Sequence, residues 1–213
     1  MIGAKAAPFL GLALLLSCAP ARRPPQATHR APSYTARLQV SIQYRHFGMP
    51  LNVLCAFDPV LDRARLEFQD PSGVTRLLLI MRPGEGWFYV PGGTRKAQWR
   101  GPGPGLPWGP QDLWALLSAD PPPGARSPDY QMGWLHRARW YNGLGKVELV
   151  FSRSETRTFP YGRAVLSGPG RAVLRCRWLS TDQKALPESV FKAPPETGSV
   201  NVPLASILRE IEP

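Results

Sequence analysis

The chain has 213 residues, with 26 Lys or Arg against 15 Asp or Glu, and its formal net charge is +11 at pH 7. A hydrophobic content of 43% supplies a core, and the length allows one domain or one domain plus a tail. The 25 Pro and 20 Gly favour short segments joined by turns over a helical bundle. No apolar run reaches about 18 residues, which excludes a polytopic membrane protein. Three Cys and three His without a cluster argue against zinc or haem, and we expect neither a metal nor a cofactor.

The N-terminal residues are typical of an export signal. Lys5 precedes an apolar stretch at 9–16, which is too short to span roughly 30 Å of hydrocarbon as a permanent helix. The tetrapeptide 15–18, Leu-Leu-Ser-Cys, resembles the bacterial lipobox, in which the thiol takes a diacylglycerol and becomes the mature N-terminus. We therefore predict a signal peptide at 1–17 and a lipid anchor with palmitate-like chains at Cys18. An ordinary signal peptide with a chance cysteine is the alternative.

Residues 18–35 are predicted to form a flexible tether. The segment 19–33 contains four prolines and three arginines and lacks large apolar side chains, so it cannot bury enough surface to fold. Ala19 follows the predicted anchor, whereas an Asp at this place marks inner-membrane retention in enterobacterial lipoproteins. The resemblance implies a protein of the bacterial cell envelope, bound to the outer membrane and facing the periplasm.

From residue 36 to the end, the pattern predicts one mainly β domain. Apolar and polar residues alternate with period two, as in the run from Leu38 to Tyr44, and turn residues separate six strands up to residue 100. A helix is expected at 110–118, because Pro110 suits a first turn, and the Pro-rich segment 119–129 is expected to be a loop. Four more strands are expected over 134–141, 146–152, 156–166 and 171–180, followed by a short helix with the apolar stripe Leu204, Ile207, Leu208 and Ile211.

The apolar face of this sheet is larger than two short helices can cover. It has to be closed by curling of the sheet, by a second sheet or by a ligand, and an apolar concavity suits acyl chains. A plain packed core is the alternative that the residues leave open.

Several segments resemble the LolA/LolB superfamily of periplasmic lipoprotein carriers and receptors, and LolB in particular. The resemblance covers most of 38–180 and rests on a strand, Pro-x-Gly turn and strand at 63–79, a helix at 113–123, and the segments 132–134, 140–141, 160–166, 175–178 and 191–195. It implies an unclosed antiparallel β-barrel of about 10–11 strands, with short helices as a lid over an apolar cavity that holds the acyl chains of lipidated cargo. The side chains expected to line that cavity are Val40, Ile42, Val53, Phe57, Leu66, Phe68, Leu78, Ile80, Trp87, Tyr89, Trp114, Leu117, Trp134, Trp140, Leu149, Phe151, Leu174 and Trp178.

One position departs from the LolB pattern. LolB carries an exposed Leu in the Pro-x-Gly turn, which helps to push cargo lipid into the membrane, whereas this chain has Ser72 there. A hydroxyl cannot supply apolar insertion, so an envelope lipoprotein of the same fold with another role is a second interpretation.

Two thiols remain once Cys18 is lipidated. Cys55 and Cys176 both fall on the predicted inner face, and in an oxidising compartment they could form a disulfide; two separate buried thiols are the alternative. The sequence lacks a Gly-x-Ser-x-Gly motif, a P-loop and a His-Glu-x-x-His motif, and His136 alternates with tryptophans on a strand as a core residue does. We therefore expect a protein that is not an enzyme.

Two functions remain open. The first is a membrane-anchored receptor that binds lipoprotein acyl chains or other lipid, as a monomer, and receives them from a periplasmic carrier protein. The second is an envelope lipoprotein that acts as a structural or assembly partner through protein contacts, without lipid transfer. The positive charge suits anionic lipid or an acidic carrier, and nucleic acid is not expected as a partner of an exported protein.

Overall fold

The computed structural model describes residues 31–44, 47–92, 95–103, 106–153, 161–194 and 200–208. The predicted signal peptide at 1–17, Cys18 and residues 18–30 of the predicted tether lie outside these residues. The sheet begins at Tyr34, two residues before the predicted start of the domain at residue 36. Among the described residues, no helix combines the length and the apolar character that crossing a membrane requires.

The first half of the chain forms an antiparallel meander, because each alternating run is followed by a tight turn. Each strand pairs with the one before it in the chain. The strands are β1 (Tyr34–Tyr44), β2 (Phe47–Asp58), β3 (Arg63–Gln69), β4 (Thr75–Arg82), β5 (Glu85–Tyr89) and β6 (Arg95–Trp99).

The second half forms another meander, and its last long strand returns to the first strand of the chain. Pairing of β11 with β1 joins the two meanders into one sheet of 12 strands with the order β12-β6-β5-β4-β3-β2-β1-β11-β10-β9-β8-β7. A parallel pair of two residues, β12 with β6, forms one edge of the sheet. The added strands are β7 (Arg126–Gln131), β8 (Trp134–Tyr141), β9 (Lys146–Arg153), β10 (Tyr161–Ser167), β11 (Val173–Gln183) and β12 (Val200–Asn201).

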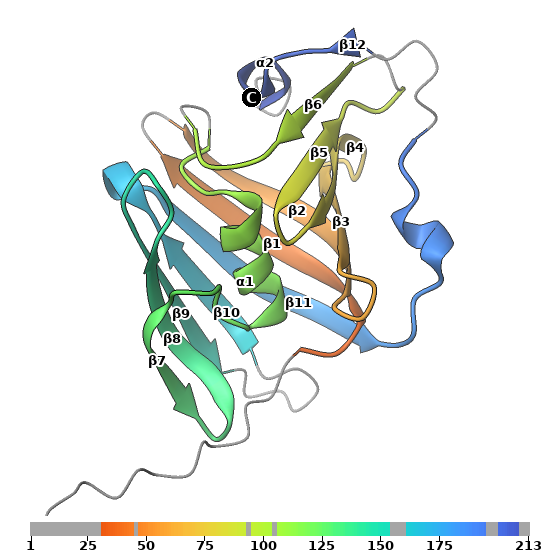
Figure 1. Cartoon of the computed structure of the whole chain (residues 1–213). Helices are drawn as coiled ribbons and strands as arrows, with labels where there is room; N and C mark the ends of the chain where they lie inside the picture. Colours follow the sequence, from red (N-terminus) through yellow and green to blue (C-terminus); the bar gives the residue numbers. More distant parts are fainter. Residues whose placement is uncertain are drawn as a thin grey trace, which may run out of the picture.

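The sheet curls around helix α1 (Pro110–Ser118) without closing into a barrel (Figure 1). Helix α2 (Leu204–Leu208) lies beside β6 and β5 at one end of the curl. Two 3-10 turns, η1 (Pro169–Arg171) and η2 (Glu188–Phe191), complete the elements, and η2 packs on the outside of the sheet next to β3. The predicted fold class, a mainly β unclosed antiparallel sheet with short helices on its concave side, is confirmed.

The prediction that 119–129 is a loop is wrong in its second part, which forms the edge strand β7. The sequence of β7 does not alternate between apolar and polar residues, and it contains Pro128. The strand is also irregular in structure, since Ser127 has a positive φ of 45°. Proline has no N–H for a ladder and is therefore found in sheets almost only at edges and bulges. The pairing of β7 with β8 shifts register twice, between Arg126 and Asp129 and between Asp129 and Tyr130.

Candidate functional site

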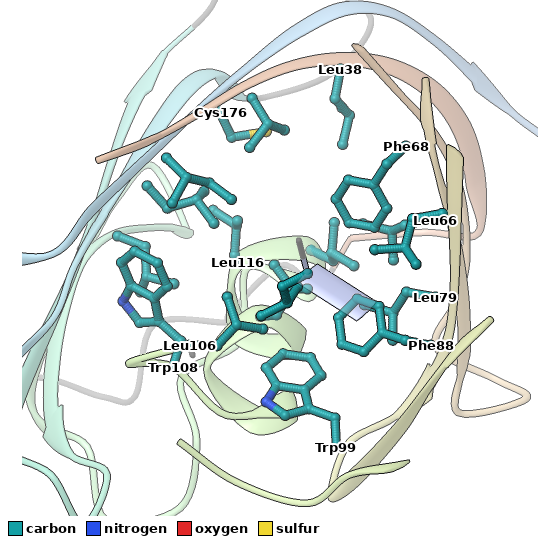
Figure 2. Close-up of a pocket in the computed structure, with 18 residues that line it drawn as sticks. Leu38, Leu66, Phe68, Leu79, Phe88, Trp99, Leu106, Trp108, Leu116 and Cys176 are labelled. Atoms are coloured by element: carbon teal, nitrogen blue, oxygen red, sulfur yellow. The ribbon is translucent and has the colours of Figure 1, made fainter. Parts of the chain in front are cut away.

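An apolar cavity lies between the concave face of the sheet and the two helices. Its lining includes Leu116 and Leu117 of α1 and Leu208 of α2, and none of the described residues that line it is charged. Figure 2 shows Leu38 and Cys176 on one wall, Leu66 and Phe88 on a second, and Trp99 and Trp108 toward the helices. The remaining lining residues are Val40, Ile42, Phe68, Leu77, Leu79, Leu106, Leu113, Leu166 and Leu174.

The cavity is small in this conformation. Its volume is about 60 Å³, whereas an engineered protein cavity that binds benzene measures about 150 Å³. The concave face is therefore neither solidly packed nor open enough for a hydrocarbon chain, and a ligand of that length requires one wall to move.

Six of the predicted cavity residues line this cavity. They are distributed over both halves of the sheet and α1: Val40, Ile42, Leu66, Phe68, Leu117 and Leu174. A further eight belong to the same apolar core without lining the cavity. Six of these are buried in the core: Val53, Phe57, Trp140, Leu149, Phe151 and Trp178. The other two, Trp114 and Trp134, are partly buried and pack against it.

Four predicted cavity residues lie on the opposite face of the sheet. On β4, Leu77 and Leu79 pair with Phe68 and Leu66, which line the cavity, so the intervening Leu78 and the next residue, Ile80, face outward. Their partners on β5 share that outer face: Tyr89 is opposite Leu78, and Trp87 is opposite Ile80. Both faces of β4 and β5 are apolar in sequence, so alternation alone does not determine the register. The prediction that these four residues line the cavity is therefore wrong, because the inward-facing residues of β4 and β5 are the ones next to them in the chain.

The sequence analysis also did not predict most of the cavity-lining residues that lie outside the strands. Leu106 and Trp108 precede α1 in a Pro- and Gly-rich segment that has no periodicity to read. Trp108 packs tightly, since a Cβ added to Gly168 would come within 2.6 Å of its Nε1. Leu113, Leu116 and Leu208 belong to the apolar faces of the predicted helices, which was the one signal that could have identified them.

The N-terminus of α1 is held by a buried carboxylate. Asp112 is 2% exposed and sits at the third helical position, where its Oδ2 accepts from the backbone N–H of Gly109 at 2.7 Å. Oδ2 also accepts from Nδ2 of Asn142 at 2.8 Å, and Oδ1 accepts from Nε1 of Trp140. A carboxylate at this helix end is stabilised by the helix dipole. Asp112 therefore ties α1 to β8 and to the turn that follows it.

The other end of α1 is tied to the start of the sheet. The buried hydroxyl of Tyr34 donates to the carbonyl of Leu117 at 3.1 Å, and the N–H of Ala31 donates to the carbonyl of Ser118 at 3.1 Å. Burial, and then the nearby thiols of Cys55 and Cys176, raise the pKa of Tyr34 well above 10. The hydroxyl thus stays protonated and able to donate this bond at neutral pH, so α1 is fixed at both ends.

The two cysteines are free, buried thiols, so of the two alternatives that the sequence left open the structure has the separate thiols and not the possible disulfide. Cys55 on β2 pairs with Ala36 of β1, and Cys176 on β11 pairs with Val40 of β1. Strand β1 therefore separates them by two strand spacings, about 10 Å, and the offset from Ala36 to Val40 along β1 places their Cα atoms further apart than that. A disulfide needs Cα atoms within about 7 Å.

Burial gives the two thiols a measurable effect on stability at high pH. It raises the pKa of Cys55 from 9.0 to about 12 and that of Cys176 further still. The unfolded state loses a thiol proton near pH 9 while the native state keeps it, so the free energy of unfolding falls as pH rises from 9 toward 12. The expected slope is about 1.4 kcal/mol per pH unit for each thiol. Urea unfolding of the wild type and of Cys55→Ala at pH 8 and pH 10.5 measures it. Equal pH dependence in the two proteins would contradict the assignment.

The turn that carries Ser72 is organised by Asp70. The Ser72 hydroxyl donates to Asp70 Oδ1 at 2.6 Å, and Arg76 forms an ion pair with Oδ2 at 2.7 Å. These bonds, the hydroxyl contributing most, lower the pKa of Asp70 from 3.8 to about 2. Ser72 is exposed and already engaged with a carboxylate, so its side chain offers no apolar tip. Among the described residues, no group of three or more His, Cys, Asp or Glu side chains could hold a metal ion.

Neither a family model nor a curated protein matches the sequence, but solved structures match the fold. An outer membrane lipoprotein-sorting protein domain from Vibrio parahaemolyticus superposes with a TM-score of 0.55 at 13% identity, covering 75% of this chain and 89% of that one. A LolA superfamily protein from Nitrosomonas europaea also gives 0.55, at 9% identity, covering 79% and 93%. The chain has the LolA fold. A DUF1329 family protein from Desulfovibrio piger shares this fold at a TM-score of 0.50 and 15% identity, covering 78% and 92%.

Proposed function

We propose that this protein binds the acyl chains of lipidated cargo in the cavity beneath α1, as a LolB-like receptor in lipoprotein localisation. The observation that carries the proposal is a cavity on the concave face of the sheet whose described lining residues all have apolar or thiol side chains. Its fold is also that of a neighbour named for outer-membrane lipoprotein sorting. The role requires binding and release without catalysis.

The energetic reason for such a role is the cost of exposing hydrocarbon to water. At about 0.8 kcal/mol per CH₂, a 16-carbon chain costs roughly 12–13 kcal/mol when it is fully exposed. A lipidated protein therefore needs a covering pocket while it is between membranes. Anchoring of the receptor through Cys18, at the outer membrane and facing the periplasm, would hold that pocket where the cargo is delivered.

Opening of the cavity is assigned to α2. Helix α1 is held at both ends by buried hydrogen bonds, whereas β12 joins α2 to the sheet over two residues, with one more hydrogen bond from Val202 N to Lys96 O. Within the described residues, the buried Nε1 atoms of Trp99 and Trp108 lack hydrogen-bond partners. Unpaired buried donors cost about 1–3 kcal/mol each, so exposure of the Trp99 indole, on β6 beside α2, would offset part of the free energy needed to leave the closed state.

The decisive experiment compares the binding of an acyl probe to the wild type and to a variant in which a large side chain fills the cavity. The full chain carrying Cys18→Ala is titrated with a fluorescent fatty-acyl probe and examined by native mass spectrometry for lipid that co-purifies. Val40→Trp places a large side chain in the cavity wall, and we expect it to weaken probe binding at least tenfold because the ring takes the space of the ligand.

Val165→Trp is the matched control. Val165 lies on β10 between Ala164 and Leu166, both buried in the core, so its side chain faces the outside of the sheet. This variant should bind the probe as the wild type does. Equal binding by wild type and Val40→Trp, with both folded by circular dichroism, would refute the cavity assignment.

A second function is favoured by one observation on the outer face. A groove of about 370 Å³ lies between β1–β3, β11 and the segment containing η2, and its lining includes Arg37, Glu67 and Asp182. A groove that combines apolar surface with charged side chains suits a segment of another protein, as expected for an envelope assembly partner without lipid transfer. That function predicts a stable complex in pull-down from envelope extracts, lost in Arg37→Glu, together with no uptake of the acyl probe.

A further inference from the structure

The outer face of β10 and β11 carries three closely spaced arginines, two of which are opposite each other across the ladder. Arg163 is directly opposite Arg177, and Arg175 is two residues from Arg177 and therefore on the same face. All three side chains are exposed, and none forms an ion pair with a carboxylate of the described residues. Arg175 Nη1 donates to Gln43 Oε1 at 3.4 Å. We call these three residues the arginine cluster.

In the part of the chain that the structure describes, the residues paired with the arginine cluster on the neighbouring strands β1 and β9 are neutral. Gln39 and Ser41 of β1 are opposite Arg177 and Arg175, and Ser152 of β9 is opposite Arg163. Further along the face, Glu148 is already engaged by Arg137 and Arg139, with N–O distances of 3.3 and 2.7 Å. The half-buried Val165, opposite Arg175, puts apolar surface among the guanidinium groups.

This arrangement is unfavourable for folding alone. Like charges directly opposite each other on neighbouring strands destabilise a sheet, whereas an acidic residue at either place would form a cross-strand ion pair. A ligand that carries negative charge would offset the repulsion. Guanidinium groups bind phosphate through two parallel N–H bonds, which makes phosphate the best match for closely spaced arginines.

We propose that the arginine cluster docks this protein onto the phosphate groups of an anionic phospholipid bilayer. Charge complementarity selects the occupant: the cluster lies on the broad outer face of neighbouring strands, about 4.8 Å apart, and exposed arginine mixed with apolar side chains suits a lipid–water interface. The cluster alternates along β10 and β11 with Ala164, Leu174 and Cys176, which are buried in the core, so it lies on the side of the sheet away from the cavity and docking leaves the cavity free. The inference is independent of acyl binding.

The test measures binding of the full chain to lipid vesicles. Cys18→Ala removes the predicted acyl anchor, and co-sedimentation compares vesicles of phosphatidylcholine with vesicles that contain 30% phosphatidylglycerol. Each arginine near an anionic surface contributes roughly fivefold to partitioning, so replacing all three by Gln should weaken binding to the anionic vesicles about a hundredfold. Binding to neutral vesicles should be weak throughout.

The control removes the same charge elsewhere. Arg76 and Arg82 on β4 and Arg100 just after β6 are exposed in the other half of the domain, and their triple Gln variant should lose less than about fivefold. Arg163→Glu is a second probe, which should raise the melting temperature by pairing with Arg177 while it abolishes vesicle binding. Equal losses in the two triple variants, unchanged binding in the cluster variant, or equal binding to neutral vesicles would overturn the proposal. Capture of an acidic protein without vesicle binding would overturn it as well.

Discussion

Asp112→Ala should lower the free energy of unfolding by about 3–5 kcal/mol. The substitution removes both carboxylate oxygens and leaves the buried donors of Gly109 and Trp140 without their acceptor, while Asn142 keeps its bond to the carbonyl of Pro107. It also removes the negative charge that stabilises the N-terminus of α1. For a domain of this size the loss corresponds to roughly 10 °C in melting temperature. Thermal and urea unfolding followed by circular dichroism measure it.

The control for this experiment is Gln111→Ala, one residue earlier on the same helix. Gln111 is exposed, so its replacement should change the free energy of unfolding by less than about 0.5 kcal/mol. Asp112→Asn should fall between the two, since the amide keeps one acceptor oxygen and turns an NH₂ toward a donor. A loss below 1 kcal/mol in Asp112→Ala would mean that the tie between α1 and β8 does not hold the helix.

Ile207→Ala should accelerate uptake of an acyl probe by ten- to thirtyfold. Ile207 is fully buried where α2 packs on the core, and the neighbouring Leu208 lines the cavity. Removing the side chain weakens that packing by about 2 kcal/mol or more, and each 1.4 kcal/mol shifts the population of the detached helix about tenfold. Stopped-flow fluorescence of probe association measures the rate.

Leu186→Ala is the comparison variant for uptake. Leu186 is also buried but belongs to a separate apolar cluster with Ala56 and Phe191, away from the cavity. It should lower stability without changing the association rate. If Ile207→Ala and the wild type take up the probe at the same rate, α2 is not the element that opens.

The sheet could be predicted from the sequence because most of its strands are alternating runs bounded by turns. The alternation of Leu38, Val40 and Ile42 places them on one face, and the structure has them there, along the cavity. The boundaries of α1 also follow from the sequence, since Pro110 suits the first turn of a helix and the apolar run ends with it. Both signals are local, and local signals can be read without knowing the fold.

The parts that could not be predicted depend on contacts between distant residues. The inner face of β4 is set by pairing with β3, because Leu77 to Ile80 is apolar throughout. The separation of Cys55 from Cys176 depends on β1 pairing on both sides, which joins residues far apart in the chain. The ties of Asp112 to the strand-end residues Trp140 and Asn142 are of the same kind. Period and composition carry no information about which strands become neighbours.

An open sheet has two edges with unpaired N–H and C=O groups, and each edge can pair with a strand of another molecule. At one border, β7 carries Pro128 and a doubly shifted ladder, which makes it a poor template for another chain. At the opposite border, β6 is capped by the short parallel strand β12. The sheet can therefore stay open without pairing edge to edge with other copies into fibres.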